Sequence, residues 1–365
     1  MTTEIQYGQY VVPSSDKMVN FGVGQPSNKE LPLEIVKKAS VQISELNDDS
    51  LLQYGDIPGY YEFRKVLGKF LENRYSEEVN PDNLFVTNGV TGALSLICSL
   101  YISKCKKIYV EEPTYFLAIN IFKEFGFNVE SIPMKEDGID LSFLEKKLAN
   151  DSNEVKLLYT IPSFHNPSSI TMSEEKRLKL SELSYEHNIH IIADEVYQML
   201  YFKEEDKPPK PLHYYCDNVF SLSSFSKILA PSLRLGWIQT SDYLMDLLKS
   251  CGQLDSSGGI NPFISRIVHN VIQNGDLDLY LDKMRKVLYE RCNVLCENLD
   301  TGSFVKPKGG YFVWLDTDVN TMNMLNYCND NKVKYHSGNK FSGNNSLENY
   351  IRLSFSFYDL EGLKI

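Results

Sequence analysis

Two patterns of apolar residues follow one another along the middle of the chain. Short, mostly apolar runs predict buried strands, and apolar positions three and four residues apart predict helices. The predicted strands are 84–87, 107–110, 155–160, 189–194, 219–223 and 235–238. The predicted helices are 32–46, 59–75, 92–101, 115–125 and 173–187. Strands that alternate with helices predict an α/β fold whose mostly parallel sheet is covered by helices on both faces.

The pattern changes after about residue 240. Here the sequence predicts two long helices, 263–274 and 276–298, followed by strands at 309–315 and 350–355. We interpret this part as a smaller α+β domain that is completed by the N-terminal segment. The predicted division is a large domain over 46–250, and a small domain built from 1–45 and 251–365.

Polar side chains follow several of the predicted strands, at the point where each strand ends. They are Asn88, Glu112, Asn166, Asp194 and Lys227. Open parallel sheets bind their ligands at the carboxyl ends of the strands. We therefore expect these residues, which are distant in sequence, to meet at one edge of the sheet.

Charge and cysteine content exclude several classes of protein. The chain has 365 residues, with 37 Lys and Arg against 48 Asp and Glu, a net charge of −11. Non-specific nucleic-acid binding and membrane-surface binding both need clustered basic residues, so neither is expected. The seven cysteines form no Cys-x-x-Cys pair, which argues against disulfides and structural metal sites. We see no signal peptide and no membrane span, and expect a cytoplasmic protein.

Lys227 and Asp194 suggest a specific chemistry when taken together. Alone, Asp194 could be a helix N-cap and Lys227 a solvated surface lysine. As a pair at one sheet edge, they suit a pyridine aldehyde phosphate. The lysine would bind the aldehyde as an imine, and the aspartate would keep the ring nitrogen protonated. Nearby serines and an arginine would hold the phosphate.

Nine short motifs, in collinear order, match one known family. The sequence resembles the fold-type I, pyridoxal-phosphate-dependent aminotransferases of class I/II. It is most similar to the branch with α-aminoadipate and kynurenine aminotransferases and the aminotransferase-like domains of certain bacterial regulators. The matching segments are 21–27, 52–59 with Arg64, 87–94, 112–115, 162–168, 193–197, 224–237, 309–314 and 351–355.

The resemblance implies three catalytic residues. Lys227 would bind the cofactor covalently and then move a proton between the substrate and the cofactor, with a pKa lowered towards neutrality by burial and a nearby cation. Asp194 would pair with the pyridine nitrogen. Tyr197 would place its hydroxyl on the phenolic oxygen of the cofactor, although a plain core tyrosine is the alternative.

The remaining cofactor contacts are also implied by the family. Tyr115 would stack on the ring, and Asn166 would contact both the phenolic oxygen and the substrate carboxylate. A helix start would offer N–H groups to the phosphate. The phosphate-binding residues would be Val90, Thr91, Ser224, Ser226 and Arg234. Tyr54 occupies the position of a tyrosine that reaches the phosphate from the neighbouring subunit, which implies a homodimer with shared sites.

Two residues are expected to receive the substrate. Arg352 interrupts an apolar strand and would hold the α-carboxylate by two parallel hydrogen bonds, with an ion pair to Glu348 as the alternative. Gly24 would let the N-terminal segment approach the substrate closely. The sequence departs from the family at Ser169, where relatives have glycine, and in its short C-terminal end. We expect the loop at Ser169 to be placed differently, although Asn166 is intact. We expect the short C-terminal end to affect domain closure and substrate affinity more than cofactor binding.

The expected activity is therefore ping-pong transfer of an amino group between an L-amino acid and a 2-oxo acid. A pyridoxal-phosphate lyase that eliminates a β-substituent would use the same residues, and a non-enzymatic regulator that binds the cofactor is a third hypothesis. Family members that take dicarboxylic donors often have a cation in the N-terminal segment. Here only Lys17 or Lys29 could serve, because Arg64 lies in a helix. Aromatic, kynurenine-like or other neutral donors are therefore favoured.

Overall fold

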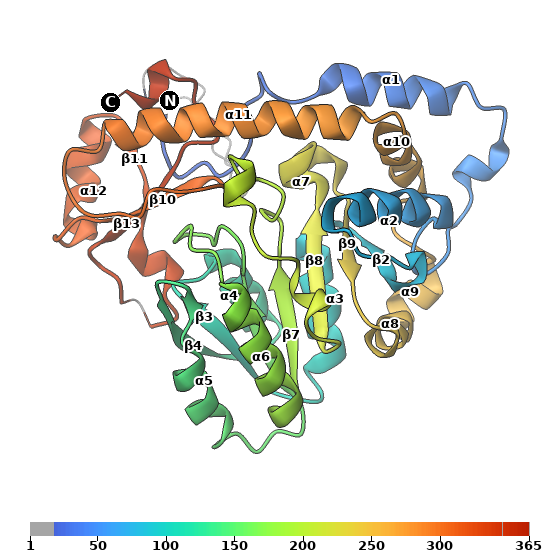
Figure 1. Ribbon diagram of the computed structural model, residues 1–365, viewed down its shortest axis with the longest axis horizontal. Coiled ribbons are helices and arrows are strands. Elements are labelled where there is room, and N and C mark those ends of the chain that lie inside the picture. The colour runs from blue at the N-terminus through green and yellow to red at the C-terminus, as the bar shows by residue number, and fades with distance from the viewer. Residues whose placement is uncertain (1–17, 345, 365) are drawn as a thin grey trace, which may run out of the picture.

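A large mixed sheet forms the centre of the computed structural model, which describes residues 18–344 and 346–364 (Figure 1). Its strand order is β2-β9-β8-β7-β6-β3-β4-β5. The five strands from β8 to β4 are mutually parallel, and antiparallel pairing occurs only at the two ends. The strands are β2 Leu84–Thr87, β3 Lys107–Glu112, β4 Asn128–Lys135, β5 Gly138–Ile139, β6 Lys156–Thr160, β7 Ile189–Asp194, β8 Val219–Ser224 and β9 Gly236–Gln239. The predicted α/β class with a mostly parallel sheet is confirmed.

Helices cover both faces of this sheet, which explains why its central strands are mainly apolar. Every residue of β6 and β7 is buried. One face packs against α3 (Gly89–Tyr101), α4 (Phe116–Glu124) and α8 (Asp242–Lys249). The other packs against α5 (Leu141–Leu148) and α6 (Glu174–His187). The loops at the carboxyl ends of the strands stay free of these layers.

The C-terminal part builds two smaller sheets, and the N-terminal segment contributes a strand to one of them. Strands β10 (Phe312–Asp316), β13 (Tyr350–Ser354) and β12 (His336–Ser337) are antiparallel, in that order. Strand β1 (Val19–Asn20) pairs with β11 (Val333–Lys334). The long helix α11 runs across both parts (Figure 1). The remaining helices are α1 Leu33–Ser44, α2 Tyr61–Tyr75, α7 Phe225–Ile228, α9 Gly252–Ser257, α10 Pro262–Gln273, α11 Asp276–Glu297 and α12 Thr321–Asp330.

Several elements were not predicted from the sequence. The sequence of strand β4 has no long apolar run, and Ile132 is its only fully buried side chain. Its extended conformation depends on pairing with β3, a contact that local sequence does not encode. The short helices α5, α8, α9 and α12 were also missed. The predicted helices and strands are present, with ends shifted by up to three residues.

Three features of the described residues concern membranes, disulfides and metals. None of the helices within residues 18–344 and 346–364 has the length and apolar character that crossing a bilayer requires. The seven cysteines are all free thiols. In the same residues, no group of three or more His, Cys, Asp or Glu side chains is arranged to hold a metal ion.

Candidate active site

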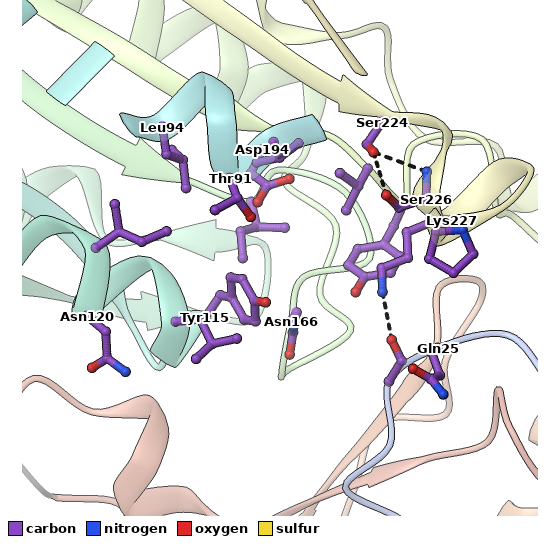
Figure 2. Close-up of a pocket in the computed structure, with 18 of the residues that line it drawn as sticks. Gln25, Thr91, Leu94, Tyr115, Asn120, Asn166, Asp194, Ser224, Ser226 and Lys227 are labelled. Carbon is purple, nitrogen blue, oxygen red and sulfur yellow. Dashed lines mark hydrogen bonds between the residues drawn. The ribbon is translucent and has the colours of Figure 1, made fainter. Parts of the chain in front are cut away.

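A cavity of about 720 Å³ lies at the carboxyl ends of the central strands (Figure 2). Its walls also include the N-terminal segment and strands β10 and β13 of the small sheet. Twelve of the thirteen predicted site residues line it: Gly24, Val90, Thr91, Tyr115, Asn166, Asp194, Tyr197, Ser224, Ser226, Lys227, Arg234 and Arg352. Tyr54 does not. It lies on a loop before α2, and 81% of its side chain is exposed.

Lys227 lies on the single-turn helix α7, directly after β8. Its Nζ donates a hydrogen bond of 2.6 Å to the carbonyl oxygen of Gly24 (Figure 2). Burial, reinforced by the positive charge of Arg352, lowers the pKa of Lys227 to about 8. The residue is therefore no ordinary surface lysine. With this pKa, about a tenth of its amine is unprotonated at pH 7.

Asp194 ends β7, and its two carboxylate oxygens have different surroundings. Oδ2 accepts a hydrogen bond of 2.9 Å from the Tyr159 hydroxyl. Oδ1 is buried and has no hydrogen-bond partner among the described residues. Burial raises the pKa of Asp194 to about 6, although this hydrogen bond acts in the opposite direction. A turn rather than a helix follows the residue, so the helix N-cap interpretation is wrong.

One end of the cavity is rich in hydrogen-bond donors. Helix α3 begins there at Gly89, whose φ of +68° and missing Cβ let Arg234 approach, because a Cβ would lie 2.8 Å from Arg234 Nη2. The same guanidinium donates from Nη1 to Ser226 Oγ at 3.2 Å. Ser224 Oγ instead caps α7 by accepting from the Ser226 N–H. The N–H groups at the helix start, Ser226 and Arg234 together suit an anion.

Arg352 is buried at the opposite end of the cavity. It donates from Nη1 to Asn166 Oδ1 at 3.0 Å and from Nη2 to the Gly22 carbonyl at 2.7 Å. Its Nε has no partner among the described residues. It forms no ion pair with Glu348, which instead accepts from Asn320, so that alternative is wrong. Its charge is thus available to a ligand.

Gly24 and Ser169 both adjoin Phe312 of β10. A Cβ on Gly24 would lie only 2.9 Å from the Phe312 ring, so glycine is required for this close approach. Ser169 adopts a left-handed conformation with φ of 60°, which glycine adopts more easily. Its hydroxyl donates to the Phe312 carbonyl. Ser169 therefore adopts a backbone conformation that glycine favours, and its hydroxyl ties the turn after Asn166 to β10.

Sequence reasoning missed several residues of the site. Tyr159 lies within a strand whose residues are all buried, so no alternation distinguished it from the core. Phe312 was predicted only as part of a strand, yet its ring lies 4.1 Å from the Arg352 guanidinium. The cavity also reaches Gln25 and, on α4, Leu117, Asn120, Ile121 and Glu124. The helical spacing of these α4 residues was the only available signal.

Comparisons with known proteins agree with this geometry. The family description "Aminotransferase class I and II" matches residues 16–361. An aromatic-amino-acid aminotransferase of Thermococcus litoralis is 30% identical, over 99% of this chain and 89% of its own. A 2-aminoadipate transaminase of Thermus thermophilus is 27% identical, over 95% and 87%. The solved kynurenine aminotransferase of Pyrococcus horikoshii has a TM-score of 0.87 and 27% identity, covering 96% of this chain and 89% of its own.

The match extends over almost the entire chain, and the fold agrees with it. A partly buried lysine, a buried aspartate and a helix start suited to an anion meet in one cavity, which is the set of groups that pyridoxal-phosphate chemistry needs. The chain belongs to the class I and II aminotransferases, and is an enzyme that transfers amino groups with pyridoxal phosphate.

Proposed function

We propose that Lys227 and Asp194 hold the cofactor between them, and that the enzyme takes aromatic or other neutral amino donors. The observation that carries the first part is the unpartnered Oδ1 of Asp194, which is buried in the same cavity as the Lys227 amine. A buried carboxylate oxygen without a donor is costly. A protonated pyridine nitrogen would supply that donor, so the residues fit the cofactor.

The roles of the residues follow from their chemistry. The bound cofactor supplies an electron sink, which stabilises negative charge at the substrate Cα. Lys227, with a pKa of about 8, is matched to taking the Cα proton and returning it near neutral pH. The Tyr197 hydroxyl would donate to the phenolic oxygen. Burial raises the pKa of Tyr197 well above its usual value, so it keeps its proton.

We assign the donor-rich end of the cavity to the phosphate. The N–H of Val90, the hydroxyls of Thr91 and Ser226, and the Arg234 guanidinium would hold it. Ser224 would act mainly by capping α7, because its hydroxyl bonds to backbone and to Ser226. The ring of Tyr115 would stack on the cofactor ring.

The substrate carboxylate would bind between Arg352 and Asn166. The donor side chain would then meet a wall that is apolar at Phe312, Leu117 and Ile121 and polar at Asn120 and Glu124. No further cation from the described residues lines the cavity beyond Lys227, Arg234 and Arg352. Lys29 is exposed and paired with Asp359, Arg64 is bonded to backbone away from the cavity, and Lys17 lies outside the described residues. Neutral donors are therefore favoured, with 2-oxoglutarate or pyruvate as acceptor.

We also propose a homodimer in which Tyr54 of one chain reaches the phosphate of the other. Tyr54 and Leu52 are more than four-fifths exposed on one loop, an unusual state for large apolar side chains that a second copy would relieve. Within each chain, residues 46–250 would form the large domain, and 1–45 with 251–365 the small one. The free cysteines support a reducing, cytoplasmic location.

A donor–acceptor matrix on the purified protein tests the reaction and the donor class. Kynurenine, tyrosine, phenylalanine and methionine should convert the bound cofactor to pyridoxamine phosphate, and 2-aminoadipate should do so less well. Equal turnover of 2-aminoadipate and phenylalanine would contradict the donor proposal. Pyruvate and ammonia from cysteine-type substrates, without this conversion, would instead identify the lyase.

Borohydride reduction tests the central assignment. Reduction of the loaded protein, followed by digestion, should label the peptide that contains Lys227. Lys227→Ala should lose turnover and labelling while the cofactor still binds non-covalently. A label on another lysine would overturn the assignment. Salt-dependent binding of a DNA duplex by the purified chain would favour the regulator hypothesis instead.

A further inference from the structure

The hydroxyl of Tyr159 has one partner, the cofactor-facing aspartate. Tyr159 lies on β6 and is fully buried, and its register partner on β7 is Ile192. Side chains alternate along a strand, so Ile192 and Asp194 point to the same face of the sheet. Tyr159 and Asp194 are thus diagonal neighbours on adjacent strands, a spacing that a tyrosine can bridge.

This contact makes the two carboxylate oxygens of Asp194 unequal. Tyr159 donates to Oδ2 at 2.9 Å, and Oδ1 stays free on the cavity side. A carboxylate that accepts a hydrogen bond at one oxygen is fixed in orientation, and its ionised form is stabilised. A phenol buried to this degree requires a partner. The hydrogen bond therefore orients the Asp194 carboxylate and also gives the buried Tyr159 hydroxyl its partner.

The other ionisable groups around Asp194 act less directly. Lys227 and His165 approach from α7 and from the loop after β6, and both favour the ionised carboxylate. Glu195 is adjacent in sequence, and Tyr197 lies two residues further along. Among the groups that favour ionisation, the Tyr159 hydroxyl has the largest effect, although burial outweighs it. Without this hydroxyl, the pKa of Asp194 would rise further.

We infer that Tyr159 is a positioning residue, which keeps Asp194 ionised and aims its Oδ1 at the pyridine nitrogen. This inference rests on the proposed role of Asp194. It assigns a function to a side chain that does not itself line the cavity. Its predicted signature is a loss of cofactor affinity that depends on the ring nitrogen and on pH.

Tyr159→Phe is the test, because it removes one oxygen atom and leaves the ring in place. The matched control is Tyr109→Phe. Tyr109 is also fully buried, and it donates to Asp151 Oδ2 at 2.7 Å from the neighbouring strand β3, away from the cavity. Both variants lose a hydrogen bond to a carboxylate. Only Tyr159→Phe should change how the protein binds its cofactor.

The readout is the dissociation constant of the cofactor, measured by absorbance on the full-length protein stripped of cofactor. Hydrogen bonds to charged groups are strong enough that Tyr159→Phe should weaken binding roughly tenfold or more at pH 7. Asp194 would then protonate at a higher pH, so the pH below which affinity is lost should rise by about one unit. Tyr109→Phe should change neither quantity.

A cofactor analogue without the ring nitrogen separates positioning from a purely structural effect. The wild-type protein and Tyr159→Phe should bind 1-deazapyridoxal phosphate equally. If the variant weakens the binding of both compounds alike, or of neither, the inference is wrong. If the wild type itself does not prefer pyridoxal phosphate over the analogue, the proposed role of Asp194 fails first.

A second variant covers the case in which Tyr159→Phe does not fold. Incorporation of 3-fluorotyrosine at position 159 keeps the hydroxyl and makes it a better donor. The pH below which affinity is lost should then fall instead of rising. An unchanged value would overturn the inference as well.

Discussion

Gly24→Ala would test how closely the N-terminal segment must approach the substrate arginine. The backbone of Gly24 is not left-handed, so alanine fits its conformation. The added Cβ would lie 2.9 and 3.0 Å from two carbons of the Phe312 ring. Carbon atoms normally approach to about 3.5–4.0 Å, so the ring must move by roughly 0.5–1 Å. Phe312 is almost fully buried, and its ring packs against Tyr197 and Arg352.

The cost of this movement can be bounded. Forcing extra volume into a packed core costs about 1–3 kcal/mol. If about 1.4 kcal/mol of this appears as weaker carboxylate binding at Arg352, the KM for amino donors rises about tenfold. The affinity for the cofactor should change little, because neither Gly24 nor Phe312 is among the residues proposed to hold the phosphate. Steady-state kinetics with phenylalanine and cofactor titration of the stripped protein give the two quantities.

Gly252→Ala is the matched control, because a Cβ at that position meets nothing within 4 Å. It should leave both quantities at their wild-type values. The reasoning is refuted if Gly24→Ala keeps the wild-type KM, or if it loses cofactor and substrate affinity in the same proportion. The second result would mean that the substitution disturbs the whole site and not the contact with Phe312.

Three further predictions concern other parts of the site. Arg352→Lys removes the two-pronged donor and should raise donor KM about a hundredfold in steady-state kinetics while cofactor affinity is kept. Ser169→Gly relieves the left-handed strain but loses the hydroxyl bond to Phe312, so the free energy of unfolding in urea should change by less than about 1 kcal/mol. Ser169→Ala keeps the strain and should cost about 1–2 kcal/mol. Since burial lowers the pKa of Lys227 to about 8, its neutral amine increases as pH rises, and stopped-flow absorbance should show aldehyde capture by the stripped protein rising with pH and levelling off above about 8.

The sequence was sufficient for the elements whose residues are all buried. The β6 and β7 runs are mainly apolar and every residue in them is buried, which is characteristic of a strand covered on both faces. Strand β4 could not be found in this way, because only pairing with β3 makes its polar sequence extended. The antiparallel placement of β9 at one end of the sheet is also a tertiary property, since its sequence resembles that of a parallel strand.

The residues of the site also fall into two groups, those that the sequence could predict and those that it could not. Residues to which we assign the chemistry, such as Lys227 and Asp194, follow strands and belong to motifs, so they could be named in advance. Tyr159 could not, because its function depends on which strand pairs with β7 and in which register. The left-handed conformation of Ser169 had one signal, the glycine that relatives have at this position, since serine itself does not favour that conformation. The role of Tyr159 depends on contacts between strands, which the type of residue alone does not predict.

The bond between Arg352 and Asn166 joins two separate sheets, because Arg352 belongs to the small sheet and Asn166 follows a strand of the large one. A ligand carboxylate that enters between them would bridge the same two bodies and strengthen their attachment. An amine without a carboxylate would fill the cavity and leave the bodies tied by protein contacts alone. The enzyme would thereby discriminate amino acids from simple amines in two ways, by the charge of the carboxylate and by the attachment between the two sheets that only a carboxylate strengthens.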